Sequence, residues 1–386
     1  MSVPYILSGL KKAINGGSLL LFSLFGILCI GMLYTENTKE GLAIIERHQS
    51  LLVFPFLLST FSFISRKQKQ KLLNVFVYSA ALAGLFCLGH AGYDYLESGT
   101  VYPTGQTGHF TYNRFMHHRL SSAIGMHAIY FSFYCSIAGI AVLQKLLFAP
   151  KIGIKWRLTN GILFLFFIVL LFLLKSSLFA FAFPLSCLLL LFIKLKNQLL
   201  KPKYAIGFLI ICCIAALLSY QGIRSKLDTF KTTYAFTDTS MRPLAMRMAL
   251  WSSTWQAIQE EPLLGVGTGD GDEVLIEEFK RVGFVLGEQS RFNAHNMYLQ
   301  YWLSNGVVCT SLFIAFLLLL FIKALRHQNF IFFAFTLFFA FFSITESTML
   351  KQKGVVFFTF FALLFLTDPN CWAYSTQETH ENNSSS

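Results

Sequence analysis

A histidine stands between two asparagines near the end of a long polar stretch of the sequence. The order is Asn293-Ala-His295-Asn296, and an apolar run rich in aromatic residues follows directly. An imidazole whose pKa is about 6.5 can take a proton from a hydroxyl group at the wet end of a helix, an effect of roughly 100- to 10,000-fold on a reaction rate. The alternative is a histidine that only caps or borders that helix.

Two arginines upstream could bind an anion. Arg242 and Arg247 lie in a stretch that is otherwise rich in Met, Ala, Leu and Trp. A planar guanidinium can bind phosphate through two parallel hydrogen bonds, and it stabilises negative charge that develops on a leaving group. For Arg247 this role is favoured over that of a solvated rim charge, and for Arg242 the rim charge is favoured.

Four more polar side chains beside or within apolar segments could contact a substrate. Lys175 ends an apolar run, where it either supplies a point charge or anchors a helix end at a membrane interface. His127 and Tyr130 fall one helical turn apart in an apolar segment, where they either line a cavity or share one interhelical hydrogen bond. Lys351 follows Glu346 in a charged turn; it either adds positive field, with Glu346 pairing to it or to an arginine, or is an ordinary turn residue.

The sequence offers no spacing typical of a metal or nucleotide site. His117 and His118 have no third ligand near them, and Asp270 and Asp272 suit a solvated acidic face better than a metal cage. The glycine-rich run 265–271 has no preceding strand and no GK[ST] after it, so it is interpreted as a turn. We therefore expect neither a metal nor a cofactor.

The elements that must position these residues are strongly apolar. Of 386 residues, 55% are hydrophobic and 13% are charged, against roughly 25% charged in soluble proteins. This composition excludes an ordinary soluble enzyme. Blocks of about 18 to 20 uncharged residues can each cross the roughly 30 Å hydrocarbon layer as a helix. The sequence predicts an all-α polytopic membrane protein with about ten transmembrane helices, near 17–34, 49–65, 73–93, 121–143, 157–174, 177–194, 204–221, 306–325, 329–345 and 354–368.

The net charge of +12 has a simple distribution along the chain. The basic clusters fall in alternate connections between the apolar blocks, which is the positive-inside pattern and not a nucleic-acid patch. We expect the lipid bilayer as a partner, no nucleic acid, and both termini in the cytoplasm. The predicted regions are 1–221 with seven spans, an outer loop at 222–295, 296–368 with three spans, and a disordered cytoplasmic tail at 369–386.

The outer loop at 222–295 is predicted to be partly helical. Apolar residues at helical spacing predict one helix over Met241 to Glu261, which Pro262 ends, and a second over Asp272 to Val282. The first of these helices would carry Arg247, with Trp251 one turn later.

Three motifs in this region resemble the signature of the O-antigen ligase and polymerase superfamily. They are Arg247-Met-Ala-Leu-Trp251, Glu261-Pro-Leu-Leu-Gly265 and Asn293-Ala-His295-Asn296-Met-Tyr298-Leu. The family carries an arginine on an amphipathic helix of a long periplasmic loop, a glycine-rich turn after a proline, and an HN-x-Y/F-L motif before the next span. The resemblance is strong over 240–325 and weaker over 110–190 and 345–365. The family's Ser-Arg-like dipeptide is replaced by Lys175-Ser176, so a second guanidinium is missing.

The resemblance implies a metal-independent, inverting glycosyltransferase on the periplasmic face of the bacterial inner membrane. Its donor would be a glycan on polyprenyl diphosphate, and its acceptor a hydroxyl, with the sugar core of lipopolysaccharide as the expected case. His295 would be the base or would orient the acceptor, and Arg247 would bind the diphosphate. Substrate-binding support would come from Arg242, Lys175, His127, Tyr130, Asn296 and Lys351.

Two other readings stay open. Within the superfamily, the protein could instead join repeat units as an O-antigen or exopolysaccharide polymerase, or could glycosylate proteins. A flippase or transporter for lipid-linked sugars is a more distant class; it would ordinarily show repeated halves and charged or broken helices at mid-membrane. The sequence shows neither of these features.

Overall fold

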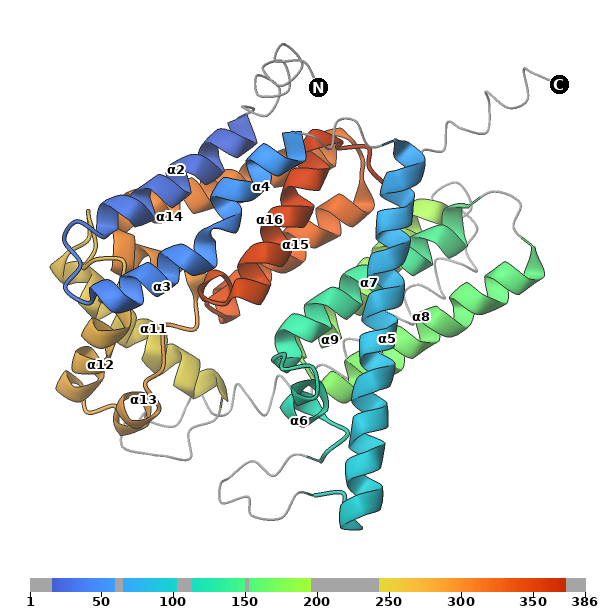
Figure 1. Ribbon diagram of the computed structural model, residues 1–386, viewed down its shortest axis with the longest axis horizontal. Coiled ribbons are helices and arrows are strands. Elements are labelled where there is room, and N and C mark those ends of the chain that lie inside the picture. Colours follow the sequence, from blue (N-terminus) through green and yellow to red (C-terminus); the bar gives the residue numbers. More distant parts are fainter. Residues whose placement is uncertain (1–15, 60–64, 103–112, 150–152, 196–242, 373–386) are drawn as a thin grey trace. The chain divides into compact units, whose positions relative to one another are not determined.

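The computed structural model describes residues 16–59, 65–102, 113–149, 153–195 and 243–372. Within these ranges the protein is built of helices joined by turns, without a β-strand (Figure 1). The chain divides into two compact units. The first unit comprises Met1–Phe63, Leu209–Lys323 and Phe339–Pro369, and the second comprises Ile64–Phe208, Ala324–Phe338 and Asn370–Ser386.

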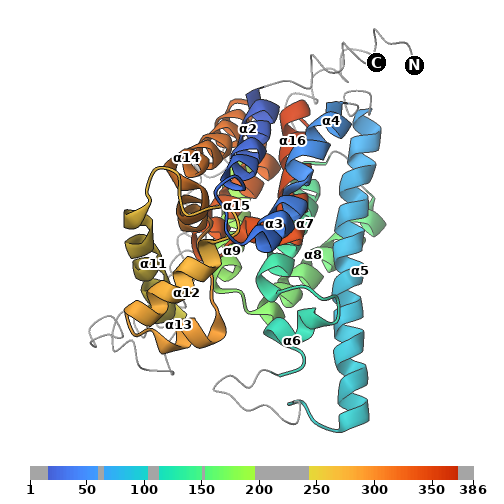
Figure 2. The ribbon, with the colours of Figure 1, turned by 60° about the vertical axis from the view of Figure 1, so that its left-hand side comes forward.

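The first unit is organised around helix α16 (Gln352–Thr367), most of whose side chains are buried. Helices α2, α3 and α4 pack against it, and helices α11, α12 and α13 form a separate group near the start of α14 (Figures 1 and 2). Two elements cross the boundary between the units: α14 extends three residues beyond it, and α15 begins before it. The bounds are α2 Gly16–Gly31, α3 Thr38–His48, α4 Ser50–Ser59, α11 Pro243–Glu260, α12 Gly271–Arg281, α13 Val285–Ser290, α14 Met297–Arg326, α15 Phe330–Thr345 and the 3-10 turn η3 Thr348–Leu350.

The second unit is organised around α7 (Ala128–Phe148), which is buried along most of its length. Phe133 of α7 stacks on Phe179 and on Phe335, with ring centroids 5.8 Å apart in both pairs. Aromatic packing therefore fixes the centre of this unit. The helices around α7 are α5 Arg66–Ser98, α6 His117–Ser122, α8 Ile154–Leu174 and α9 Ser177–Leu195.

Helix α5 is longer than the span predicted at 73–93. It begins with a capping box, in which Ser65 and Gln68 satisfy each other's backbone N–H groups, and it ends at Gly99 in the left-handed conformation. Its 33 residues extend about 50 Å at 1.5 Å each, beyond the roughly 30 Å of hydrocarbon. The basic residues at 66–71, predicted as a connection, are thus the first turns of the helix.

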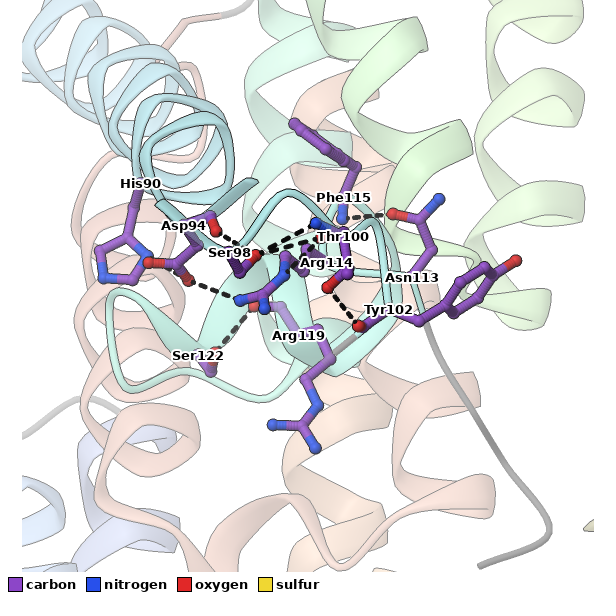
Figure 3. Close-up of polar contacts among 10 residues, drawn as sticks. All are labelled: His90, Asp94, Ser98, Thr100, Tyr102, Asn113, Arg114, Phe115, Arg119 and Ser122. Atoms are coloured by element: carbon purple, nitrogen blue, oxygen red, sulfur yellow. Dashed lines mark hydrogen bonds and ion pairs between the residues drawn. The ribbon is translucent and has the colours of Figure 1, made fainter. Parts of the chain in front are cut away.

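Polar contacts of Arg114 fix the chain just beyond the end of α5 (Figure 3). The backbone N–H of Arg114 donates to the carbonyl of Val101 at 3.1 Å, and its Nε donates to the carbonyl of Thr100 at 3.0 Å. Its guanidinium also lies 3.6 Å from Asp94, which pairs with His90. These contacts hold the segment before α6 against the end of α5.

Helix α14 is broken at Asn305 and Gly306, at the start of the predicted span 306–325. The glycine-rich turn fills the break: the N–H groups of Val266 and Gly267 donate to the carbonyls of Leu303 and Ser304, each at 2.9 Å. A Cβ atom at Gly306 would collide with the backbone of the turn. The predicted turn is therefore present. Its backbone packs closely against α14 and satisfies the carbonyl groups that the break leaves without an intrahelical partner.

The acidic residue at the end of this turn is buried, contrary to the expectation of a solvated face. The carboxylate of Asp270 accepts the backbone N–H groups of Glu36 and Asn37, at 2.9 and 2.7 Å. It thereby holds the connection between α2 and α3. Asp272 is also partly buried and accepts a hydrogen bond from Gln300 at 3.0 Å.

Four helices of the described chain are long and apolar enough to cross a membrane: α5, α7, α8 and α14. Four shorter helices are also apolar, namely α2, α9, α15 and α16. The predicted span at 204–221 lies outside the described residues, as does part of 49–65. The protein is therefore a helical membrane protein, and the count of ten spans stays a prediction.

Both helices predicted in the outer loop are present, as α11 and α12. Helices α3, α6 and α13 were not predicted. The expectation of disorder from residue 369 is wrong for its first residues, because Cys371 and Trp372 are buried. The indole of Trp372 donates to the carbonyl of Lys69 at 2.8 Å. Residues 373–386 lie outside the described chain.

Candidate active site

Three charged or titratable side chains meet within the first unit. Arg247 comes from the first turns of α11, His295 from the turn before α14, and Glu346 from the turn after α15. Glu346 Oε2 lies 3.0 Å from His295 Nδ1, and Glu346 Oε1 lies 3.4 Å from Arg247 Nη2. One carboxylate thus contacts both residues that the sequence motifs single out.

This geometry defines the chemical state in which His295 is useful. A carboxylate only accepts hydrogen bonds, so Nδ1 of His295 carries a hydrogen and donates it to Glu346. In the neutral ring Nε2 then presents its lone pair and can accept a proton from another group. A proton taken at Nε2 gives an imidazolium that the Glu346 carboxylate stabilises.

The three side chains are partly buried and still reach solvent. The exposed fraction is 26% for His295 and for Arg247, and 14% for Glu346. Charges in such a partly desolvated site interact more strongly than charges in bulk water. The three side chains therefore remain electrostatically coupled while part of each is accessible to solvent.

The backbone of His295 is held in a conformation that costs energy. Its φ of 44° lies in the left-handed region, which disfavours residues other than glycine. The N–H of His295 donates to Asn293 Oδ1 at 2.9 Å, and the indole of Trp251 donates to its carbonyl at 3.5 Å. Asn293 Oδ1 also accepts from Ser347 at 3.1 Å, which ties the His295 turn to the turn that carries Glu346.

Asn296 has a structural partner for its side-chain oxygen. Asn296 Oδ1 accepts the N–H groups of Tyr298 and Leu299 at 3.0 and 3.2 Å, which caps the start of α14. This contact gives the side-chain oxygen a structural role, and substrate binding by Asn296 stays a prediction. Sequence reasoning had grouped it with the residues that bind substrate.

Lys351 lies on the surface at the N-cap of α16, within a mixed group of charges in the first unit. The pKa of Asp272 is raised, mainly by burial, and the charges of Lys351 and Arg47 offset part of this rise. Gln300 joins Asp272 to the histidine turn, because its Oε1 accepts the N–H of Ala294 at 3.0 Å. The charge of Lys351 thus acts on Asp272, and its role in substrate binding stays a prediction.

In the second unit, Lys175 ends α8 in the left-handed conformation, with φ of 49°, and its side chain is exposed. Burial, and secondly the charge of Lys175, lower the pKa of His117. The rings of His117 and His118 follow one another at a centroid distance of 3.9 Å. Lys175 therefore stands in an imidazole-rich environment.

The expectation that His127 lies inside a span is wrong, because α7 begins one residue later. His127 is the N-cap residue and is exposed, whereas Tyr130 is buried in the first turn. The N–H of Ala128 donates to His118 Nδ1 at 3.2 Å, and the His118 and His127 rings lie 3.5 Å apart between centroids. The two residues proposed to line one cavity thus differ in environment.

Two further points concern the predicted site residues. Arg242 lies outside the described residues. Among the residues that the structure describes, no group of three or more His, Cys, Asp or Glu side chains could hold a metal ion. Sequence reasoning did not assign Glu346 to His295. It expected Glu346 to pair with a lysine or an arginine, and the contact with Arg247 confirms the arginine.

Comparison with known proteins finds one similarity, in the central part of the chain. No curated protein matches the chain. Residues 162–314 match the family model described as O-Antigen ligase. The matched segment contains Lys175, Arg247 and His295, whereas His127 and Lys351 lie outside it. The protein is thus a helical membrane protein whose residues 162–314 are similar in sequence to the O-antigen ligase family.

Proposed function

We propose that this protein transfers a glycan from polyprenyl diphosphate to an acceptor hydroxyl, as an O-antigen ligase. The observation that carries the proposal is the 3.0 Å contact between His295 and Glu346, on a carboxylate that Arg247 also contacts. A base, its orienting acid and a cation suited to diphosphate are the groups that such a displacement needs. The family match supports a lipid-linked glycan as the class of donor.

In the proposed reaction, Nε2 of His295 takes the proton of the acceptor hydroxyl. The acceptor oxygen forms a bond to the anomeric carbon as the bond from that carbon to the diphosphate oxygen breaks. A single displacement of this kind inverts the anomeric centre. Glu346 keeps the hydrogen on Nδ1 and stabilises the imidazolium that forms.

Arg247 is proposed to hold the diphosphate. A guanidinium has five N–H donors, so its contact with Glu346 leaves others for phosphate oxygens. Negative charge on the diphosphate grows as the glycosidic bond breaks, and contacts that strengthen with this charge lower the barrier. Lys175, Arg242 and Lys351 would add positive charge, with neither metal nor cofactor required.

The expected acceptor is the sugar core of lipopolysaccharide, at the periplasmic face of the inner membrane. Polymerisation of repeat units and glycosylation of proteins use the same donor chemistry, so they are the alternatives. A transporter is the more distant class, and the break in α14 is a feature that transporters share. In this protein the backbone of Val266 and Gly267 fills the break, which favours a structural explanation for it.

The proposal is tested by transfer in vitro. Purified protein in proteoliposomes is incubated with polyprenyl-diphosphate glycan and, in parallel, with lipid core, with further lipid-linked repeat units, or with a candidate protein, in buffer containing EDTA and no nucleotide. We expect the mass of the glycan to appear on the lipid core. A mass ladder on the donor lipid would indicate a polymerase, and modified protein would indicate a protein ligase. No transfer to any acceptor, with movement of the donor across the bilayer, would contradict the enzyme assignment.

A further inference from the structure

An apolar surface on the first unit has no role in the proposed transfer. It consists of Leu33, Tyr34, Trp255, Leu263 and Leu264, which we call the apolar rim. The exposed fraction is 85% for Leu33, 70% for Leu263 and 64% for Leu264. Tyr34 and Trp255 are also exposed. Large apolar side chains that gather at one surface mark a site of interaction.

Direct contacts hold the segments of the rim together. The hydroxyl of Tyr34 donates to the carbonyl of Leu264 at 2.7 Å, which joins the end of α2 to the glycine-rich turn. The indole of Trp302 donates to the carbonyl of Pro262 at 2.9 Å, and Trp255 meets Trp302 edge to face at 5.4 Å. Because the same turn is inserted into the break of α14, the exposed leucines stand on a fixed support.

The rim begins where the exposed stripe of α14 ends. On α14 the exposed apolar residues recur every three to six positions, and this helix is long and apolar enough to span a membrane. Its exposed stripe is therefore expected to face lipid. The rim lies beside the break at Asn305 and Gly306, next to that end of the stripe. The N–H of Val307 donates to the carbonyl of Pro262 at 3.2 Å, and the backbone of Leu263 and Leu264 lies against Gly306. The stripe consists of Val308, Ile314, Leu318, Ile322 and Leu325.

The rim also has the composition of a membrane interface. Trp and Tyr favour the headgroup level, where an aromatic ring is buried and its polar atom reaches a partner. Leucines beside them can enter the boundary between headgroups and acyl chains. Glu36, Glu260 and Glu261 flank the rim in sequence and are exposed, as expected for residues that stay in water.

We propose that the apolar rim inserts into the headgroup–acyl boundary of the outer leaflet and anchors the glycine-rich turn and α11 to the membrane surface. The occupant of this surface is the lipid bilayer. Trp255 and Arg247 are eight positions apart on α11, hence about 12 Å along the helix axis at 1.5 Å per residue. The anchor thus sets the height of Arg247 above the bilayer, independently of which glycan the protein transfers.

The test uses a fluorescent label on one introduced cysteine in the full chain, which keeps its seven other native cysteines once Cys29 is replaced. Leu263→Cys and, as the matched control, Glu277→Cys on the exposed face of α12 are each made in a Cys29→Ala background. Each is labelled with bimane and reconstituted in vesicles of phosphatidylethanolamine and phosphatidylglycerol, with or without brominated acyl chains. The labelled Cys29→Ala protein gives the background to subtract.

We expect brominated lipid to quench the label at position 263 and not at position 277. Quenching at neither position would overturn the proposal. A blue-shifted label at position 263 that brominated lipid does not quench, and that shifts back on dilution of protein in lipid, would show a second copy on the rim instead and would also overturn it. The chain has five tryptophans, so the share of Trp255 in the quenching by brominated lipid is the difference between wild type and Trp255→Phe. As a second variant, Leu263→Asp with Leu264→Asp should reduce this share, and an unchanged share would contradict the anchor.

Discussion

Two histidines of the first unit, His295 and His48, show how environment divides one residue type between two roles. His295 is partly exposed and shares a carboxylate with an arginine. His48 is fully buried; its Nδ1 donates to the carbonyl of Ile44 at 2.8 Å and its Nε2 accepts from the hydroxyl of Tyr301 at 3.1 Å.

The difference lies in what each ring can do with a second proton. Burial lowers the pKa of His48 to about 4, so this ring stays neutral and both nitrogens are used in packing. The ring of His295 has a carboxylate that stabilises its protonated form, and a side that reaches solvent. An imidazole alone does not identify the candidate base. The distinguishing features of His295 are a partner of opposite charge and access to water.

The largest expected effect is on the rate of transfer, and it should differ between substitutions of the two histidines. His295→Ala should lower transfer by roughly 100-fold or more, because the proton acceptor is removed. The matched control, His48→Gln, should keep most of the activity at equal protein level. Rates of glycan transfer in proteoliposomes give both values. A His295→Ala protein with more than about a tenth of wild-type activity would exclude an essential base.

The second prediction removes the partner that distinguishes His295. Glu346→Gln should lower transfer roughly 10- to 100-fold, since an amide holds the ring less well and does not stabilise imidazolium. The plot of rate against pH should change shape as well as height, because the charge beside the ring is lost. If Glu346→Gln only lowers the amount of folded protein, with an unchanged rate per molecule, the carboxylate is structural.

The third prediction concerns the cation on the same carboxylate. Arg247→Lys keeps the charge and loses the two-pronged contact, at an expected cost of about 2 kcal/mol, roughly 30-fold in rate. Arg247→Ala should be worse. Wild-type rates for Arg247→Lys together with an inactive Arg247→Ala would mean that charge alone matters.

The fourth prediction tests the charge in the second unit. Lys175→Ala should lower transfer roughly tenfold, for a loss of about 1.5 kcal/mol, and Lys175→Arg should preserve or raise it. A lysine that only anchors the helix end in headgroups predicts equal rates for all three proteins. Assays at matched protein levels distinguish these outcomes.

The fifth prediction concerns stability and leaves the transfer rate aside. Because the folded pKa of His48 is about 4, below its usual value of about 6.5, the unfolded chain binds more protons between these values. The contribution of the neutral His48 ring to the free energy of unfolding is therefore complete above about pH 6.5 and is lost as the pH falls towards 4. The melting temperature should fall over this window, and less so for His48→Gln. Equal pH dependence of the two proteins would contradict a buried neutral ring.

Local signals in the sequence predicted part of this picture. Helices α11 and α12 follow from apolar spacing, and α11 ends two residues before Pro262. The position of His295 before an apolar helix also follows from local order. The extension of α5 was missed because Ser65 and Gln68 form a capping box that carries the helix through a basic segment.

Features that depend on distant contacts were not predicted. The break of α14 is satisfied by N–H groups about 40 residues away in sequence, at Val266 and Gly267. Asp270 is buried against residues more than 200 positions away, and Glu346 is 51 positions from His295. No local pattern encodes such pairs, because each side alone resembles an ordinary surface charge or turn.

The most direct test of the central claim is a double-mutant cycle between His295 and Glu346. Transfer rates are measured for wild type, His295→Ala, Glu346→Gln and the double variant, in matched proteoliposomes with the same polyprenyl-diphosphate glycan and acceptor. If the two residues act as one unit, Glu346→Gln should have almost no further effect once His295 is alanine. If the two losses multiply, each residue acts separately, and the proposed base with its orienting carboxylate is wrong.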